Sequence, residues 1–382
     1  MTDWKDEARA LADHLAASGH LIDNQWRQAF ETVPRHVFVP RFWRDPATLL
    51  DGADPATQAE WLQAVYSDQS LTTQYASVPG TDLMWATSSS TKPSLMAHML
   101  DTLNIHTGHT VLEIGTGTGY NAALLCHRLG DTQVTSVDID PDLVQDARLR
   151  LAALGYHPTL LAGDGADGAF DNAPYDRIIA TCAVPAVPPA WIDQLAPAGT
   201  IVADLRGDLA SSIAILHKTH PDTVTGRFSC VPGHFMWLRA HPANPLRDGG
   251  EFDTVIDHDG ADEYAVTLDP QILDNADLRF LLQLTDPTLQ HLWSSHHDGT
   301  DTLHLSAEDG SWVEAQPHHG QTRITQGGPR RIWTIIEHTT ALWNQLGRPT
   351  RDRFGLTVTT TRTRAYWLDH PSDKLGDLTV PA

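Results

Sequence analysis

The sequence has few of the residues that build disulfides or metal sites. Three of its 382 residues are cysteines, at positions 126, 182 and 230, and this odd, widely spaced set predicts reduced thiols rather than disulfides. The chain contains 21 histidines, yet neither a His-x-x-x-His nor a Cys-x-x-Cys spacing occurs. The pairs His296–His297 and His318–His319 lie among residues typical of exposed loops. We therefore expect no metal in this protein.

Positive charge and long apolar runs are scarce as well. Lysine occurs only at positions 5, 92, 218 and 374, and the formal net charge is −22. Such a surface repels phosphates, so no nucleic-acid partner is expected. No apolar run approaches the ~20 residues of a membrane-spanning helix, and Met1–Glu7 lacks the basic and apolar regions of a signal peptide. We therefore expect a cytoplasmic protein with no membrane partner.

The most informative segment is Val111-Leu-Glu-Ile-Gly-Thr-Gly-Thr-Gly-Tyr120. Its apolar start predicts a buried strand, its glycines a tight turn, and the pattern over 121–129 a helix. A strand followed by a glycine-rich turn and a helix is the first unit of a Rossmann-like sheet. The glycines let the backbone approach a ligand at the helix N-terminus. This loop alone could equally hold a dinucleotide.

Two acidic segments downstream make the ligand more specific. Gln133–Asp138 predicts a second strand that ends in an acid, which can accept hydrogen bonds from ribose hydroxyls. Leu160–Gly165 predicts a third short strand that ends in Gly-Asp-Gly. Glu113 and the Gly-x-Gly-x-Gly spacing favour S-adenosylmethionine, with S-adenosylhomocysteine as product, over a nicotinamide. NAD binding remains the alternative at this point.

The remaining pattern predicts an α/β fold in two domains. Strands are expected near 110–114, 133–137, 159–162, 176–181 and 199–205, alternating with helices, and 235–238 is expected to close the sheet. N-terminal helices are expected at 3–18, 23–32 and 55–65, followed by a break at 87–93 and a helix at 94–103. Residues 240–250 are rich in Pro, Gly and Asn and predict a linker.

This linker divides the chain into residues 1–240, with an N-terminal helical segment over 1–80, and an additional domain over 241–382. In the second part we expect a hairpin about Glu308–Gly310, a helix at 331–346, and paired strands at 354–359 and 364–368. We expect a compact α/β accessory domain that helps to recognise a peptide and packs against the open C-terminal edge of the first sheet.

The first 240 residues resemble the protein-L-isoaspartate O-methyltransferase family. The resemblance rests on Val33-Pro-Arg-His-Val-Phe-Val-Pro40, on Tyr66-Ser-Asp68 followed by Ser89-Ser-Thr-Lys-Pro93, and on the run Pro188–Pro197. It implies a Rossmann-like class I S-adenosylmethionine-dependent methyltransferase. The implied reaction is transfer of a methyl group to a carboxylate oxygen.

The resemblance also implies roles for particular residues. Thr91 fills the place of the family's active-site serine, and Ser90 and Lys92 are further catalytic candidates. The expected cofactor-binding residues are Glu113, Gly115, Thr116, Gly117, Gly119, Tyr120, Asp138, Ile139, Gly163, Asp164, Gly165 and Thr181. The expected substrate-binding residues are Tyr66, Asp68, Ser89, Cys182, Val184 and Arg206. Alternatives stay open: Ser88–Thr91 could cap a helix, Tyr66 and Asp68 could be turn residues, and Cys182 could only fill space.

Departures from the family pattern point to a particular branch. Lys92 adds a cation near the expected carboxylate site, and Ala203–Gly207 stands where repair enzymes carry a proline-valine-glycine turn. The chain also continues well beyond residue 240. This long form resembles actinobacterial methyltransferases that accompany maturation of ribosomal peptides of the graspetide, lanthipeptide or lasso type.

That branch implies a modified ribosomal precursor peptide as the partner. An aspartate in its macrocycle would be esterified, and the ester would collapse to an aspartimide (succinimide) that can hydrolyse to isoaspartate. The alternatives are a repair enzyme for isoaspartate in many proteins and a binding protein without catalysis.

Overall fold

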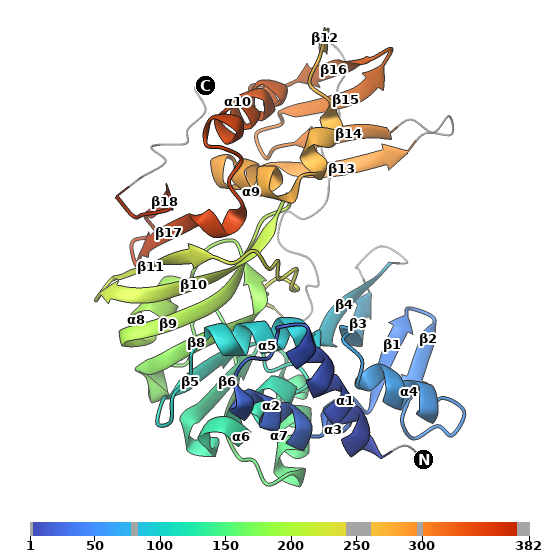
Figure 1. Cartoon of the computed structure of the whole chain (residues 1–382), viewed down its shortest axis with the longest axis vertical. Helices are drawn as coiled ribbons and strands as arrows, with labels where there is room; N and C mark the ends of the chain where they lie inside the picture. Colours follow the sequence, from blue (N-terminus) through green and yellow to red (C-terminus); the bar gives the residue numbers. More distant parts are fainter. Residues whose placement is uncertain (1–2, 78–82, 242–260, 296–300, 373–382) are drawn as a thin grey trace.

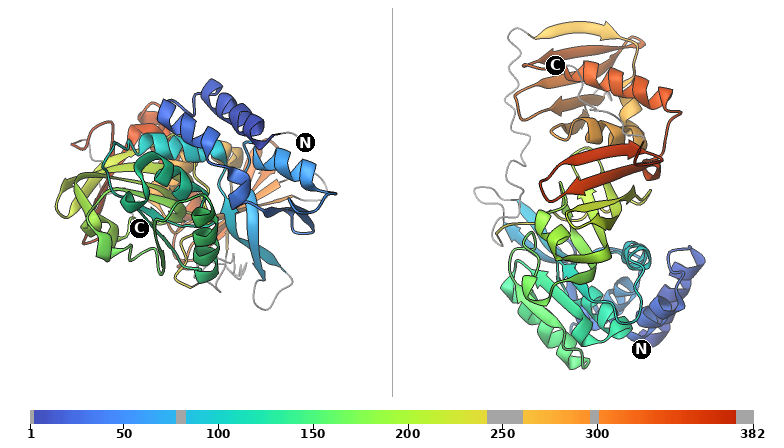
Figure 2. Two further views of the ribbon diagram at one scale, coloured as in Figure 1. Left: turned by 90° about the horizontal axis from the view of Figure 1, so that it is seen from below. Right: turned by 90° about the vertical axis from the view of Figure 1, so that its left-hand side faces the viewer.

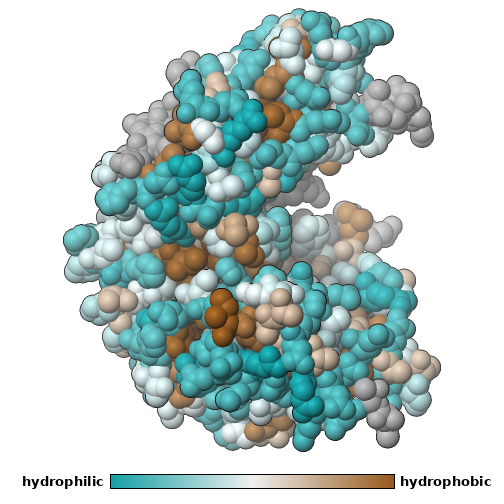
Figure 3. All heavy atoms as spheres, viewed as in Figure 1, coloured by the Kyte–Doolittle hydropathy of each residue, from teal (hydrophilic) through white to brown (hydrophobic). Residues whose placement is uncertain are grey.

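The computed structural model describes residues 3–77, 83–241, 261–295 and 301–372. The chain forms an elongated molecule in which the first 240 residues make the larger part and the C-terminal residues extend from it (Figures 1 and 2). Figure 3 shows a hollow on this face between the C-terminal part and the N-terminal strands.

A mixed sheet of nine strands runs through the larger part, in the order β18-β17-β11-β10-β9-β8-β5-β6-β7. The neighbours β7, β6, β5, β8 and β9 are parallel, and the pairs from β9 to β18 are antiparallel. Their bounds are β5 Val111–Ile114, β6 Val134–Asp138, β7 Thr159–Ala162, β8 Tyr175–Val184, β9 Leu195–Arg206, β10 Ser211–His220, β11 Thr223–Phe228, β17 Phe354–Thr359 and β18 Arg364–Leu368. The predicted parallel α/β sheet is therefore confirmed. The expectation that 235–238 closes it is wrong, because this segment forms only an isolated bridge between Trp237 and Ala183, and antiparallel strands extend the sheet instead.

Alternation along the strands gives the sheet two buried faces. Val111 and Ile179 pack on one face with helices α1 (Trp4–Ala17), α2 (Asn24–Thr32), α5 (Pro93–Thr102), α6 (Tyr120–Leu129) and α7 (Pro141–Ala153). Leu112 and Ile178 pack on the other face with Trp191 of α8 (Pro189–Gln194) and with the C-terminal part. A strand that is apolar on both faces is expected when both sides of a parallel sheet are covered.

The N-terminal segment contains strands that the sequence did not predict. With α3 (Arg35–Phe38) and α4 (Gln58–Val65) lies an antiparallel sheet in the order β2-β1-β3-β4, with bounds β1 Arg41–Asp45, β2 Thr48–Asp51, β3 Leu71–Ser77 and β4 Met84–Ser90. The predicted break at 87–93 is wrong for its first residues, which belong to β4. A run of small hydroxyl side chains carries little strand signal, although β4 pairs with β3 from Leu71↔Ser90 to Ser77↔Met84.

The C-terminal part contains a second sheet with two helices. Its order is β12-β16-β15-β14-β13, with bounds β12 Asp262–Val266, β13 Gln290–Ser295, β14 Asp301–Ser306, β15 Trp312–His318 and β16 Gln321–Gly327, and with helices α9 Ala276–Thr285 and α10 Ile332–Gln345. The predicted β14–β15 hairpin and the helix near 331–346 are confirmed. Most of the predicted linker over 240–250, and the pair His296–His297, lie outside the described residues.

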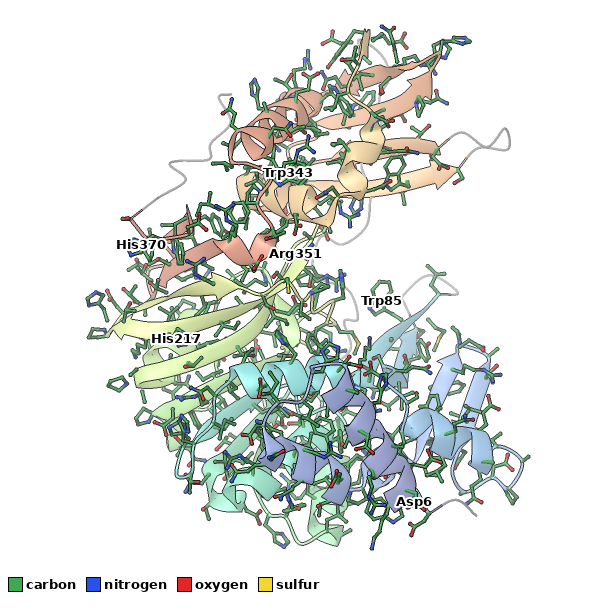
Figure 4. All side chains as sticks on the ribbon, viewed as in Figure 1. Asp6, Trp85, His217, Trp343, Arg351 and His370 are labelled. Atoms are coloured by element: carbon green, nitrogen blue, oxygen red, sulfur yellow. The ribbon has the colours of Figure 1, made fainter. Side chains whose placement is uncertain are left out.

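The last two strands join the first sheet instead of the second. β17 and β18 pair with each other as predicted, and β17 also pairs with β11, with Thr223 opposite Thr359 and Arg227 opposite Gly355. Figure 4 labels Arg351 where the two parts meet: it donates to the Ser211 carbonyl at 3.0 Å and lies 3.2 Å from the Asp277 carboxylate. The division at residue 240 thus separates strands that pair with each other.

Within the described ranges, no helix has both the length and the apolar character needed to span a bilayer. The same residues contain no group of three or more His, Cys, Asp or Glu placed to hold a metal ion.

Candidate active site

A cavity opens at the carboxyl ends of the parallel strands, where α/β sheets commonly bind ligands. Its empty space is about 870 Å³, including open solvent. The lining falls into four segments: 87–91 from β4, the loop 114–118 after β5 with Tyr120 and Asn121, residues 137–139 after β6, and 235–239. Met96, Leu143, Gly165, Thr181 and Cys182 complete the lining. The cavity thus joins the predicted nucleotide loop to the predicted catalytic segment.

The glycine loop has the backbone conformation that its sequence predicts. Gly115, Gly117 and Gly119 have φ angles of +94°, +49° and +88°, which side-chain-bearing residues rarely adopt. A Cβ on Gly115 would lie 2.8 Å from the Thr181 Oγ1, whose hydroxyl donates to the Gly115 carbonyl at 2.8 Å. Gly119 lies outside the lining and begins α6, where a Cβ would approach the Ala147 side chain at 3.0 Å. The loop is therefore held close to β8 and α7.

Asp138 ends β6 and faces the cavity. Its Oδ2 accepts a hydrogen bond from the Gly117 N–H at 2.8 Å, and its Oδ1 accepts one from the Asp140 N–H at 3.1 Å. Only 9% of the residue is exposed, and burial raises the pKa of its carboxyl. A carboxylate has about four acceptor positions. Asp138 can therefore hold the loop and still accept from a ligand hydroxyl.

Glu113 lies beneath the loop and does not line the cavity. The side chain is fully buried, and it accepts hydrogen bonds from Asn121 Nδ2 at 2.7 Å and from Ser136 Oγ at 2.5 Å. Burial raises the pKa of the Glu113 carboxyl to about 7. The Ser136 hydroxyl is also 2.6 Å from Thr116 Oγ1, in the loop itself. Glu113 thus supports the loop from behind.

The catalytic segment passes from the end of β4 into α5. Ser88, Ser89, Ser90 and Thr91 all line the cavity. No described side chain of this group caps α5, because the Ser94 N–H donates to Asp68 Oδ1 at 2.8 Å. The capping role considered for Ser88–Thr91 is therefore filled by Asp68.

Of Lys92 and the predicted substrate-binding residues, only some lie at the cavity. Lys92 is half-exposed and outside the lining, with its Nζ 3.4 Å from Asp68 Oδ2. Tyr66 is buried, with its hydroxyl 2.8 Å from His36 Nδ1, and Val184 is buried in β8. Ser89 and Cys182 do line the cavity, and burial raises the pKa of the Cys182 thiol. A protonated thiol is a poor nucleophile, which favours the space-filling role.

Arg206 does not line the cavity but contacts two residues that do, Phe235 and Trp237. Its Nη1 donates to the Phe235 carbonyl at 2.6 Å, and its guanidinium lies 5.0 Å from the centre of the Trp237 ring. Of the predicted segment Leu160–Gly165, Gly165 lines the cavity, whereas Gly163 and Asp164 are not among the lining residues. Asp164 accepts from the Ala166 N–H at 2.8 Å.

Two arginines of the site were not predicted. Arg239 lines the cavity and donates to the Thr87 carbonyl at 3.1 Å, and its charge acts to lower the pKa of Asp138. Arg35 lies behind the cavity and donates to the Thr91 carbonyl at 3.0 Å. The only sequence signal for Arg35 was its place in the Val33–Pro40 motif. Arg239 directly precedes the predicted linker at 240–250 and has no other signal in the sequence.

Comparison with known proteins agrees with this geometry. The model of the protein-L-isoaspartate(D-aspartate) O-methyltransferase family matches residues 6–229. Protein-L-isoaspartate O-methyltransferase 2 of Archaeoglobus fulgidus is 31% identical over 224 residues, which cover 58% of this chain and 88% of that protein. The protein-L-isoaspartate O-methyltransferase of Methanopyrus kandleri is 30% identical over 220 residues, covering 57% and 84%.

The fold likeness extends beyond the matched residues. A solved structure named protein-L-isoaspartate O-methyltransferase covers 95% of this chain and 100% of its own, with a TM-score of 0.56 and 21% sequence identity. A protein of that name therefore shares the fold over most of this chain.

Proposed function

The chain belongs to the protein-L-isoaspartate O-methyltransferase family, and from this premise we propose that it methylates the free carboxylate of an isoaspartyl residue in a peptide or protein. The methyl donor is S-adenosylmethionine. One observation carries the proposal: a nucleotide-type glycine loop with Asp138 and a cluster of serine and threonine hydroxyls open into the same cavity. A purely binding protein would not need a methyl-donor site beside hydroxyl groups suited to a carboxylate.

The residues of the cavity fit this donor. Gly115 and Gly117 carry no side chains, so the loop backbone at these two positions leaves room for the amino-acid part of the ligand. Asp138 offers carboxylate oxygens to ribose hydroxyls. Gly165 lets Ile114 and Leu238 of the lining pack closely, since a Cβ there would meet them at 2.6 and 3.0 Å. When bound, the donor supplies an electrophilic methyl group on a sulfonium.

The chain's own residues then have three tasks. They must bind the carboxylate, orient one of its oxygens toward the methyl carbon, and keep water away. A carboxylate is ionised at neutral pH, so no general base is needed. As the oxygen–methyl bond forms, the carbon–sulfur bond breaks and sulfur keeps the electron pair. Alignment at near-attack distance can contribute roughly 7–11 kcal/mol, and hydroxyls such as that of Thr91 can hold the carboxylate by charge-assisted hydrogen bonds.

A second candidate is esterification of an ordinary aspartate in a macrocyclic ribosomal peptide, followed by closure to an aspartimide. The supporting observation is the segment 203–207, which forms a wall behind Phe235 of the cavity lining. Asp204 is fully buried there, and accepts hydrogen bonds from Ser211 Oγ at 2.6 Å and from the Phe235 N–H at 3.0 Å. This wall replaces the turn expected of repair enzymes, which supports a different substrate shape. The hollow beside the C-terminal part in Figure 3 could receive such a peptide.

The test is intact-mass analysis of three peptides incubated with the full chain and S-adenosylmethionine. All share one sequence: a linear isoaspartyl form, a linear aspartyl form and a macrocyclic aspartyl form. We expect the isoaspartyl peptide to gain one methyl ester and the linear aspartyl peptide to stay unchanged. Methylation of the macrocycle alone, followed by loss of methanol, would select the second candidate. If no peptide is methylated by protein that binds the donor, both candidates are wrong.

A further inference from the structure

Arg35 is a buried cation directly behind the hydroxyl-rich wall of the cavity. The residue is 0% exposed, and no described carboxylate lies within ion-pair distance of it, although the charge of Asp68 acts on it from further away. Its guanidinium donates to Val65 O at 2.8 Å, Ser67 O at 3.2 Å, Gln69 O at 3.2 Å, Thr91 O at 3.0 Å, Ser90 O at 3.5 Å, and Ser90 Oγ at 3.3 and 3.2 Å from its Nε and Nη2. Burial lowers the pKa of Arg35 to about 10, so it stays charged at neutral pH.

Such an arrangement costs stability. A buried charge without an ionic partner is unfavourable even when its N–H groups are satisfied. Carbonyl oxygens could be satisfied by neutral donors, so holding the loop at 65–69 does not by itself require a cation. A role for the charge is therefore to be sought at the cavity, which Ser90 and Thr91 line.

Ser90 lies between Arg35 and the cavity, because its Oγ accepts from Arg35 and the residue belongs to the cavity lining. A hydroxyl has one hydrogen and two lone pairs. Arg35 Nε and Nη2 both lie within hydrogen-bond distance of Ser90 Oγ, so the oxygen serves as an acceptor and its hydrogen is left to donate. Among the residues that the structure describes, none accepts a hydrogen bond from this hydroxyl. Ser90 is 2% exposed, so bulk water is a poor partner for it.

We propose that Ser90 donates its hydroxyl hydrogen to the substrate carboxylate, and that Arg35 acts through Ser90 as a positioning residue that orients this hydroxyl and adds positive charge behind it. The proposal rests on the proposed function, because it needs a carboxylate substrate. A donor that itself accepts from a cation is polarised and binds an anion more strongly. The positive charge also keeps the carboxylate ionised in a chain whose net charge is −22. Thr91 can bind the second oxygen, leaving a lone pair for methyl transfer.

The kinetic test compares Ser90→Ala, Arg35→Lys and the double variant on the isoaspartyl peptide. We expect Ser90→Ala to lower kcat/KM by about 10- to 100-fold, the effect of one hydrogen bond to a charged group, with unchanged affinity for the methyl donor. Adding Arg35→Lys to Ser90→Ala should lower kcat/KM little further than Ser90→Ala alone, because both changes act on the same hydrogen bond from Ser90 to the substrate. Losses that multiply in the double variant would mean that Arg35 acts independently of Ser90 and would overturn the relay.

Matched controls come from the same sheet. Arg177 is also a buried arginine that donates to carbonyls, those of Leu103, Asp176 and Asn104, and it lies at the opposite end of β8. Ser212 is a buried serine that donates to the Ser229 carbonyl. Arg177→Lys and Ser212→Ala share the packing changes but not the cavity. We expect both to keep the peptide kcat/KM of the original chain once each is shown to be folded.

A second measurement needs no methylation. The full chain loaded with S-adenosylhomocysteine is titrated with acetate and with acetamide, followed by amide chemical shifts of residues 88–91. We expect a preference for acetate that disappears in Ser90→Ala and persists in both controls. Retention of that preference in Ser90→Ala overturns the proposal, even if Arg35→Lys does not fold. Failure of the original chain to methylate any isoaspartyl peptide would instead reject the proposed function and leave this readout to decide about Ser90.

Discussion

Replacement of Asp138 by alanine tests where the methyl donor binds. Asp138 lines the cavity at the end of β6 and already accepts two backbone N–H groups, at 2.8 and 3.1 Å. A ligand ribose would add hydroxyl donors to the same carboxylate. Loss of hydrogen bonds to a charged acceptor costs roughly 1.5–3 kcal/mol, which raises Kd about 10- to 150-fold. With only 9% of the residue exposed, little water replaces the lost partner, so we expect the upper part of that range.

The assay is isothermal titration calorimetry with S-adenosylhomocysteine and with its 2′-deoxyribose analogue. The original chain should bind the analogue more weakly, whereas Asp138→Ala should bind both ligands alike, because the partner of the missing hydroxyl is gone. Asp176→Ala is the matched control, since its carboxylate also accepts a loop N–H, that of Thr110 at 2.8 Å, but at the other end of the sheet. If folded Asp138→Ala keeps the original affinity, the ribose is not at Asp138 and the site is assigned wrongly.

Three further outcomes are expected. Thr91→Ala should lower the methylation rate with donor affinity intact while Thr91→Ser stays active; an unchanged rate in Thr91→Ala would remove the hydroxyl from the chemistry. For Glu113, burial raises the folded pKa from 4.5 to about 7, so the folded state retains a proton that the unfolded state releases. The stabilising effect of this retained proton is present below pH 4.5 and is lost as the pH rises to about 7. The free energy of unfolding, compared with that of Glu113→Gln, should therefore fall by about 3 kcal/mol over that interval. Urea midpoints that change with pH in the same way for the original chain and for Glu113→Gln would contradict this. A chain ending at residue 240 lacks β17 and should lose cooperative unfolding, whereas one ending at residue 372 should keep it, as monitored by circular dichroism; a fully cooperative shorter chain would show that β17 is dispensable.

The sequence placed the glycine loop and Asp138 at one cavity more readily than it placed the opposite wall. Gly115, Gly117 and Asp138 are close in sequence to the strands that place them, so the order strand, loop, helix, strand and acid was enough. The wall at Ser88–Thr91 needed β4, whose serines resemble a loop and whose strand character comes from pairing with β3. Local propensity is weak where cross-strand contacts decide the structure.

Long-range contacts were beyond sequence reasoning. Arg35 and Ser90 are 55 residues apart, and a single arginine in a motif gives no sign that it will be buried without an acid. The pairing of β17 with β18 followed from their alternation, but the pairing of β17 with β11 did not, because no local pattern specifies a partner so distant in the chain. Arg206 and Val184 were predicted to contact the substrate. In the structure Arg206 lies behind Phe235 of the cavity lining and Val184 is buried in β8.

The pairing of β11 with β17 has a consequence for synthesis of the chain. In topological terms the C-terminal module is an insertion within a β-hairpin: β11 ends at Phe228, the following residues stay against the first sheet as far as the bridge between Trp237 and Ala183, and the polypeptide returns to β11 at Phe354. On the ribosome, the methyltransferase sheet therefore remains incomplete until the last strands emerge. During that interval β11 presents unpaired backbone groups, the kind of edge that promotes aggregation. Closure over so long a loop is intrinsically slow, so folding yield should depend on how well the inserted module folds first and brings its two ends together.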